Sequence, residues 1–357
     1  MRHPSGASMK TVRVLIVDDS STMRHLLRFR LRSDPRIEVV GEASNADEAR
    51  AGIARLSPDV LTLDVEMPGL SGLDFLRELM RTRPMPVIMI SSETQKGSAA
   101  AIEALSRGAI DCVGKPRANE AGNAFADLPS LICGAVSANV TRRSDAVRGR
   151  ASVITDFEWN RKLVLIGSST GGVDALEQIF AHLPENCPPI LVTQHMPEGF
   201  LASFAQRMNS RFAPDIRLAE DQMPLVQGCV MIAPGGDRHL AISPGLRPQC
   251  QLLAMEKVSG HRPSVDVLFE SALPIAERLV AVLLTGMGAD GARGMVALRK
   301  RGAICLAQDE ASSVVWGMPR MAWENGGADR LVALEAMGPE LLTAADRRGR
   351  HARGAAR

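Results

Sequence analysis

Short hydrophobic runs alternate with amphipathic stretches along the first third of the chain. The hydrophobic runs that predict buried strands are residues 14–17, 39–40, 60–63, 87–90 and 110–113. The stretches that predict helices between them are residues 21–32, 46–56, 72–81 and 98–106. Strand followed by helix, repeated in this way, is typical of a parallel sheet with helices on both faces. Such sheets bind their ligands at the carboxyl ends of the strands.

The same alternation stops near residue 117 and resumes after residue 160. The polar, basic stretch of residues 141–151 has no apolar periodicity and is typical of a linker. Further strands are predicted at residues 163–166, 190–193, 230–233, 279–284 and 304–306, with helices such as 173–182 and 265–276 among them. We therefore predict two doubly wound α/β domains, residues 11–135 and 160–347, joined by a linker over residues 136–159.

Composition and charge narrow the class of protein. The chain has 357 residues, 45% of them hydrophobic, which is enough for two domains with cores of their own. Its 42 basic and 40 acidic residues nearly cancel, which argues against nucleic acid or an anionic membrane surface as the main partner. The sequence has no apolar stretch of the roughly 20 residues that span a membrane, and no signal-peptide core near its first residue. We expect a cytoplasmic protein without membrane insertion.

Acidic residues follow two of the strands predicted in the first domain. Asp18 and Asp19 end the first strand, and Asp64 ends the third. If these strands are neighbours, the carboxylates converge and repel unless a cation lies among them, and an all-oxygen cluster suits Mg²⁺. Ser91 ends the fourth strand and Lys115 follows the fifth, where both would contact a phosphoryl group carried by an aspartate. Each acid alone is more typical of a helix cap, but all of these residues in strand order indicate one site.

This set of residues resembles the receiver domain of two-component response regulators, which implies a flavodoxin-like fold. The resemblance implies that Asp64 is the phosphoacceptor, that a histidine kinase is the phosphodonor, and that Ser91 and Lys115 sense the phosphoryl group. The Mg²⁺ ligands that it implies are the side chains of Asp18, Asp19 and Asp64 and the backbone carbonyl of Glu66. One departure is Cys112, which stands where receiver domains usually have an aromatic switch residue.

A glycine-rich turn opens the second domain, within KLVLIGSSTGGVDALEQIF. Gly167, Ser169 and Gly171 have the G-x-S-x-G spacing that places a serine on a sharp turn between a strand and a helix. Gly171 and Gly172 would equally permit a phosphate-binding turn, although the G-x-G-x-x-G pattern and the P-loop lysine are absent. From this turn alone, catalysis and anion binding remain equally open.

A nucleophilic serine needs a base and an acid that orients it. His195 ends the strand that follows the Ser169 helix, and a strand–helix–strand unit brings both residues to one sheet edge. His239 and His261, in loops, remain possible bases. Asp290 follows the strand of residues 279–284 and would orient the base, although capping its own helix is its ordinary role. The alternative acids are Asp237, Asp266 and Asp309.

The motifs GSSTGG, QHMP, RPSVDVLF at residues 262–269 and TGMGADGA follow the receiver-like half in that order. Together they resemble the CheB family of chemotaxis protein-glutamate methylesterases, which implies a Rossmann-like α/β methylesterase domain. The resemblance implies Ser169 as nucleophile, His195 as general base and then acid, and Asp290 as the orienting acid. It also implies that the N–H group of Met287 binds the oxyanion and that Thr170 supports the histidine. Residues 262–266 match the family but receive no catalytic role, and Ser168 replaces a frequent alanine.

The function implied by this resemblance is phosphorylation-activated hydrolysis of glutamate methyl esters on chemoreceptors. The family uses a serine acyl-enzyme and no cofactor for ester hydrolysis, and it often deamidates receptor glutamines as well. We expect the unphosphorylated receiver domain to cover the Ser169 edge. The alternative is a response regulator whose second domain binds a ligand or partner without catalysis. A DNA-binding output is disfavoured because no basic recognition helix is present.

Overall fold

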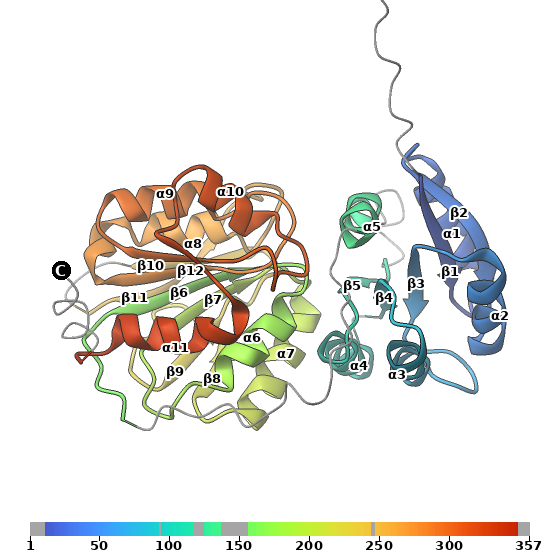
Figure 1. Cartoon of the computed structure of the whole chain (residues 1–357). Helices are drawn as coiled ribbons and strands as arrows, with labels where there is room; N and C mark the ends of the chain where they lie inside the picture. The colour runs from blue at the N-terminus through green and yellow to red at the C-terminus, as the bar shows by residue number, and fades with distance from the viewer. Residues whose placement is uncertain (1–10, 93, 117–124, 137–155, 244–246, 349–357) are drawn as a thin grey trace, which may run out of the picture. The chain divides into compact units, whose positions relative to one another are not determined.

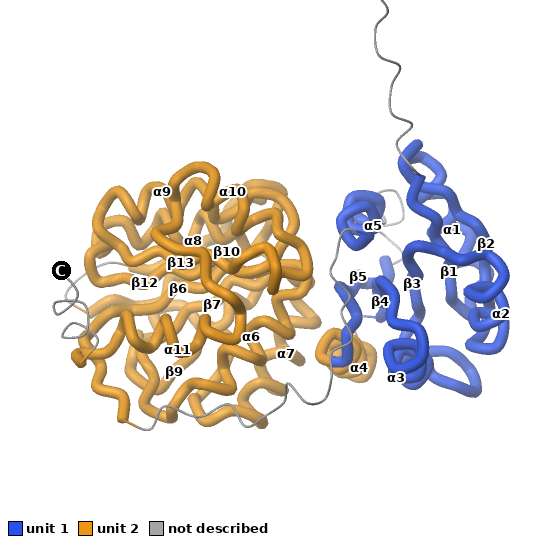
Figure 2. The backbone as a smooth tube through the Cα atoms, viewed as in Figure 1, with its two compact units in different colours: residues 1–93, 107–142 blue, residues 94–106, 143–357 orange. Residues whose placement is uncertain are grey.

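The structure is a computed structural model that describes residues 11–92, 94–116, 125–136, 156–243 and 247–348. It divides into two compact units, residues 1–93 with 107–142 and residues 94–106 with 143–357 (Figure 2). The predicted linker lies mostly outside the described residues, as do the first ten residues and the basic C-terminal tail. No helix in the described ranges has the length and apolar character needed to cross a bilayer.

The first part of the chain forms a five-stranded parallel sheet in the order β2-β1-β3-β4-β5, the order of flavodoxin-like folds. Side-chain oxygens of Ser20, Asn45 and Ser71 accept backbone N–H groups and so fix the starts of the first three helices. The elements are β1 (Val12–Val17), α1 (Ser21–Arg32), β2 (Ile37–Ala43), α2 (Ala46–Leu56), β3 (Val60–Asp64), α3 (Gly72–Thr82), β4 (Val87–Ser91), α4 (Gln95–Ser106), β5 (Asp111–Gly114) and α5 (Leu128–Val136).

The second part contains a seven-stranded parallel sheet in the order β14-β13-β12-β6-β7-β9-β8 and a separate antiparallel hairpin, β10-β11. Figure 1 shows α8, α9 and α10 on one face of the large sheet and α6, α7 and α11 on the other. Its strands are β6 (Leu163–Ser168), β7 (Ile190–Gln194), β8 (Asp215–Leu218), β9 (Cys229–Ile232), β10 (Arg238–Ser243), β11 (Gln249–Ala254), β12 (Leu279–Leu283), β13 (Ile304–Gln308) and β14 (Arg330–Val332). Its α-helices are α6 (Gly172–Phe180), α7 (Glu198–Arg211), α8 (Val265–Ser271), α9 (Ala292–Lys300), α10 (Met318–Glu324) and α11 (Leu334–Ala345).

The predicted α/β fold class is confirmed, but several bounds differ. The helix predicted over residues 265–276 ends at Ser271, and a 3₁₀ helix (Leu273–Arg278) follows it. Pro274 explains this correction, because proline lacks an N–H donor and disfavours α conformation in the preceding residue. β2 is longer than residues 39–40 because it is an edge strand whose partly exposed positions interrupt the apolar run.

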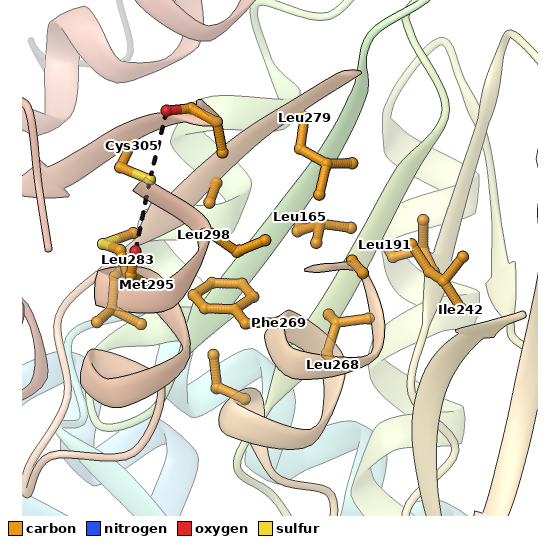
Figure 3. Packing of buried hydrophobic residues seen from close by; sticks show 14 of the residues in the cluster. Leu165, Leu191, Ile242, Leu268, Phe269, Leu279, Leu283, Met295, Leu298 and Cys305 are labelled. Carbon is orange, nitrogen blue, oxygen red and sulfur yellow. Dashed lines mark hydrogen bonds between the residues drawn. The ribbon is translucent and has the colours of Figure 1, made fainter. Parts of the chain in front are cut away.

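The core of the second unit lies between the large sheet and the helices packed on it. Phe269 of α8 and Leu298 of α9 belong to one buried cluster together with Leu165 and Leu283 of the neighbouring strands β6 and β12 (Figure 3). Both faces of these strands are covered, which is why they read as continuous apolar runs in the sequence.

In both parallel sheets, the strand that comes first along the chain lies inside the sheet, with later strands on either side of it. In the first sheet β1 lies between β2 and β3, and in the second β6 lies between β7 and β12. Crossover connections therefore lead away from the central strand on both sides, which leaves the carboxyl ends of the two strands at this point uncovered. The candidate sites are found at these two switch points.

Two phenylalanines on helices of the first unit test the assignment of buried and exposed faces. Phe75 in α3 is 1% exposed and Phe29 in α1 is 78% exposed. We expect Phe75→Ala to lower the free energy of unfolding by about 3–5 kcal/mol, because truncation leaves a cavity. Phe29→Ala should change it by less than about 0.5 kcal/mol. Urea unfolding of the full chain, followed by circular dichroism, measures both, and equal losses would contradict the assignment.

Candidate active site and phosphoacceptor site

The acidic residues of the first unit converge as predicted, because β1 and β3 are neighbours. Asp18, Asp19 and Asp64 each place a carboxylate oxygen within 4.8 Å of the others. The Nζ atom of Lys115 lies 2.8 Å from Asp64 Oδ2 and 3.3 Å from Asp18 Oδ2. The backbone N–H group of Glu66 donates to Asp64 Oδ1 at 3.2 Å.

Burial and mutual repulsion act on these carboxylates. Burial, together with the charge of Asp18, raises the pKa of Asp64 to about 6 although Lys115 opposes the shift. Burial likewise raises the pKa of Asp18. Lys115 is also desolvated, but its hydrogen bond to Asp64 and the charges of both aspartates raise its pKa. The Lys115 ammonium thus contacts two of the three carboxyl groups, and this cluster of hard oxygen donors fits Mg²⁺.

The two residues predicted to sense a phosphoryl group lie beside this cluster. Ser91 is buried at the end of β4, and its hydroxyl donates to the Ser92 carbonyl at 3.3 Å. The backbone N–H group of Lys115 donates to the Ser91 carbonyl at 2.7 Å, which joins the two residues. Cys112, three residues before Lys115, is buried in β5.

The turn that carries Ser169 depends on its glycines. Gly171 has a φ of 78°, and a Cβ atom there would lie 2.6 Å from the Val314 side chain. A Cβ atom on Gly172 would lie 2.1 Å from Gln194 Oε1. Glycine at both positions therefore permits the sharp change from β6 to α6 that leaves Ser169 at the sheet edge.

Ser169 and His195 emerge side by side because Ser168 pairs with Gln194 on the neighbouring strands. The backbone N–H group of His195 donates to the Ser168 carbonyl at 3.0 Å. The Gln194 side-chain amide donates to the carbonyls of Ser169 at 2.9 Å and His195 at 3.0 Å. The Ser168 hydroxyl donates to Gln194 Oε1 at 2.6 Å and so orients this amide.

Asp290 binds His195 and is held by the start of α8. His195 Nε2 donates to Asp290 Oδ2 at 2.8 Å. The other donors to the Asp290 carboxylate are the Ser264 hydroxyl at 2.8 Å, the Val265 N–H group at 2.7 Å and the Asp266 N–H group at 3.0 Å. Burial alone would raise the pKa of Asp290, but the hydrogen bond and charge of His195 and the backbone donors lower it. Asp290 does not cap its own helix, because the N-cap of α9 is Gly291.

The other ring nitrogen of His195 defines which atom can accept a proton. Nδ1 is buried and has no hydrogen-bond partner. The hydroxyl of Ser169 also makes no hydrogen bond to any part of the chain that the structure describes, and Ser169 is 9% exposed. Since Nε2 is hydrogen-bonded to Asp290, Nδ1 is the ring nitrogen that can accept a proton as a general base.

The alternative bases, His239 and His261, lie near His195 and Asp290 but in other positions. His239 is fully buried, and its Nδ1 accepts the backbone N–H group of Ser264, the residue whose hydroxyl binds Asp290, at 3.1 Å. The ring of His261 stacks on the ring of His195, with centroids 3.7 Å apart and planes 10° apart.

The alternative acids bind elsewhere. Asp266 Oδ1 accepts the Gly294 N–H group of α9 at 2.8 Å. Asp309 accepts from Ser312, and the exposed Asp237 pairs with Arg238. Among the described residues, Asp290 is the acid that contacts His195.

The loop after β12 runs alongside the serine. The Ser169 N–H group donates to the Thr285 carbonyl at 3.0 Å, and a Cβ atom on Gly286 would lie 2.7 Å from Ser169 Cβ. Met287 follows directly, and its N–H group has no hydrogen-bond acceptor within the described ranges. Thr170 is buried, and its carbonyl accepts the Thr285 hydroxyl at 2.9 Å. The roles predicted for Met287 and Thr170 stay predictions.

Comparison with known proteins agrees with both halves of this arrangement. Residues 164–341 match the sequence model of the CheB methylesterase family, and residues 14–124 match that of the response regulator receiver domain. A relative from Agrobacterium fabrum, named protein-glutamate methylesterase/protein-glutamine glutaminase, is 48% identical over 92% of this chain and 95% of its own length. The chain belongs to the CheB methylesterase family.

Other CheB proteins extend the comparison. A Caulobacter vibrioides relative, named protein-glutamate methylesterase/protein-glutamine glutaminase 1, is 49% identical over 95% of this chain and all of its own length. The crystal structure of the Thermotoga maritima CheB methylesterase catalytic domain is 38% identical, with a TM-score of 0.50. It covers 51% of this chain and 98% of the Thermotoga chain.

The raised pKa of Asp64 predicts a pH-dependent stability in buffer without divalent cations. Folded Asp64 keeps its proton up to about pH 6, whereas an unfolded aspartate, with a pKa near 3.8, loses it earlier. The stability of the parent protein therefore falls as pH rises through this window. We expect Asp64→Asn to raise the free energy of unfolding at pH 7 by about 1–3 kcal/mol, and the gain should vanish towards pH 4.

Urea unfolding between pH 4 and pH 7 measures this difference. Asp47→Asn is the control, because the Asp47 side chain is 93% exposed and should change stability by less than about 1 kcal/mol at every pH. An Asp64→Asn protein no more stable than its parent at pH 7 would contradict the prediction.

Proposed function

We propose that the chain hydrolyses γ-glutamyl methyl esters of chemoreceptors through Ser169, at a rate raised by phosphorylation of Asp64. The observation that carries the proposal is the state of the His195 ring. One ring nitrogen is bound to a buried carboxylate, and the other is unpartnered at the sheet edge where Ser169 emerges. Relatives that cover more than nine-tenths of the chain are named for this activity.

The proposed reaction has two halves. In the first, Ser169 Oγ attacks the ester carbonyl carbon while its proton passes to His195 Nδ1. Asp290 stabilises the imidazolium that forms, because its lowered pKa keeps it ionised. His195 then protonates the methoxy oxygen, the C–O bond breaks, and methanol leaves an acyl-enzyme. In the second half, water attacks the acyl carbon while one of its protons passes to His195. His195 then returns this proton to Ser169 Oγ as the acyl–Oγ bond breaks, which releases glutamate and restores the free serine.

The developing oxyanion needs a donor at the serine edge. The Met287 N–H group follows Gly286, which packs against Ser169, and it has no acceptor among the described residues. Such a donor is worth about 2.7–4 kcal/mol in the transition state. The same route would deamidate glutamine, with ammonia leaving instead of methanol, in line with the glutaminase names of the relatives.

The receiver half supplies the regulatory input. A histidine kinase would donate the phosphoryl group to Asp64, with Mg²⁺ held by Asp18, Asp19, Asp64 and the Glu66 carbonyl. When bound, the ion would neutralise the clustered charge during transfer. The added phosphoryl oxygens would form new bonds with Ser91 and Lys115.

The alternative of a non-catalytic second domain has less support from the turn itself. Anion binding needs open space beside the glycines. The Cβ positions of Gly172 and Gly171 face the side chains of Gln194 and Val314, so packing of the turn explains these glycines without a bound anion.

Replacement of the nucleophile tests the proposal. Ser169→Ala should abolish methanol release from methylated receptor membranes while leaving the free energy of unfolding unchanged, because it removes only the attacking oxygen. A fluorophosphonate reagent should label the parent protein at Ser169 and should fail to label Ser169→Ala and His195→Ala. A folded Ser169→Ala protein with the parental rate would show the nucleophile to be wrong.

Ser264 tests the support of Asp290. Ser264→Ala removes one of the donors to the Asp290 carboxylate, so we expect kcat to fall about 3–10-fold with KM unchanged. Ser271→Ala is the matched control, because Ser271 also makes hydrogen bonds through its hydroxyl, to Ile242 and Leu268, away from the catalytic residues. Equal loss of kcat in both variants, measured by methanol release, would remove Ser264 from the mechanism.

A further inference from the structure

We propose that His261 is a positioning residue for the general base, whose ring holds His195 in place and stabilises its charged form. This inference rests on the proposed function, because it assumes that His195 is the base. It gives a role to a residue that sequence reasoning left as a possible base.

The contact between the two rings is close and nearly parallel. The centroids are 3.7 Å apart and the planes differ by 10°. Asp290 binds one edge of the His195 ring through Nε2, and His261 covers one face. The His195 side chain is only 6% exposed. Rotation of the ring about its Cβ–Cγ bond would therefore break both contacts.

His261 is itself held by a tight turn. Val258 and His261 exchange two backbone hydrogen bonds, of 3.1 Å and 2.9 Å, across Ser259 and Gly260. Both central residues have positive φ, 53° and 82°, as in a two-residue type I′ hairpin. The next residue, Arg262, donates to the carbonyls of Gly236 at 2.8 Å and Met255 at 3.0 Å.

The same segment holds the acid. Residues 258–266 carry His261 against the face of His195 and the Ser264 hydroxyl against Asp290. Ser259 adds a hydrogen bond of 3.3 Å to Asp266 Oδ2 at the start of α8. A rigid segment that contacts both base and acid fixes their relative geometry before substrate binds.

Charge makes this contact matter for the reaction and not only for packing. An uncharged aromatic face attracts a cation placed over it, so an uncharged His261 ring would stabilise His195 more once His195 has taken the serine proton. A permanent positive charge at position 261 would instead repel the imidazolium at short range in a partly buried site.

Three variants of the full-length chain separate ring, charge and bulk. His261→Phe keeps a flat neutral ring, His261→Ala removes the ring, and His261→Lys introduces a permanent cation. The readouts are kcat and KM for methanol release and the rate at which a fluorophosphonate labels Ser169. Urea unfolding verifies that each variant is folded.

We expect kcat of His261→Phe to lie within about threefold of the parent. For His261→Ala we expect a fall of about tenfold, and for His261→Lys about 100-fold, with KM unchanged in all three. Labelling rates should fall in the same order. If His261→Ala proves too destabilising, the difference in kcat between His261→Phe and His261→Lys still decides the matter.

Parental rates in both His261→Ala and His261→Lys would overturn the inference while leaving the Ser169 mechanism intact. Equal losses in His261→Phe and His261→Ala would show that ring stacking is not the cause, and would overturn it as well. Failure to label Ser169 in the parent protein would instead overturn the proposed function, and this inference with it.

Discussion

A parallel sheet that is wound in two directions from one strand is the constraint on which both sites depend. Strands of such a sheet are buried on both faces, so chemistry is confined to their ends. In the first sheet the reversal occurs beside β1 and gathers Asp18, Asp19 and Asp64. In the second it occurs beside β6 and gathers Ser169, His195 and Asp290 from three adjacent strands. The same topology thus builds both candidate sites.

The two clusters shift the pKa values of their buried carboxylates in opposite directions. Asp64 lies among other acids, and burial with repulsion raises its pKa. Asp290 is equally enclosed, but the hydrogen bond from His195 and the donors at the start of α8 lower its pKa. The difference lies in the donors and not in the burial. It leaves the first site attractive to a cation, and the second able to stabilise an imidazolium without one.

Much of this arrangement could be predicted from the sequence, for a physical reason. Strand–helix–strand connections have one handedness, so the proximity of Ser169 to His195 follows from a short stretch of chain. Asp290 is 95 residues from His195, and family resemblance was needed to prefer it over the other acids. Ser264 and His261 lie between a hairpin and a short helix, where no periodicity indicates which way a side chain points. The hairpin β10-β11 was also not predicted from the sequence, because no clear periodicity marks its strands. Pro274, in contrast, was a visible signal for the end of α8.

The amide of Gln194 joins the backbones of Ser169 and His195 through two hydrogen bonds, and this has a consequence for how the chain can evolve. Gln194 needs the absence of a side chain at Gly172, and its orientation is set by the hydroxyl of Ser168. A carboxylate at position 194 would face two carbonyl oxygens with no proton to offer them. Drift at these three positions is therefore epistatic: a change tolerated at one depends on which residues occupy the other two.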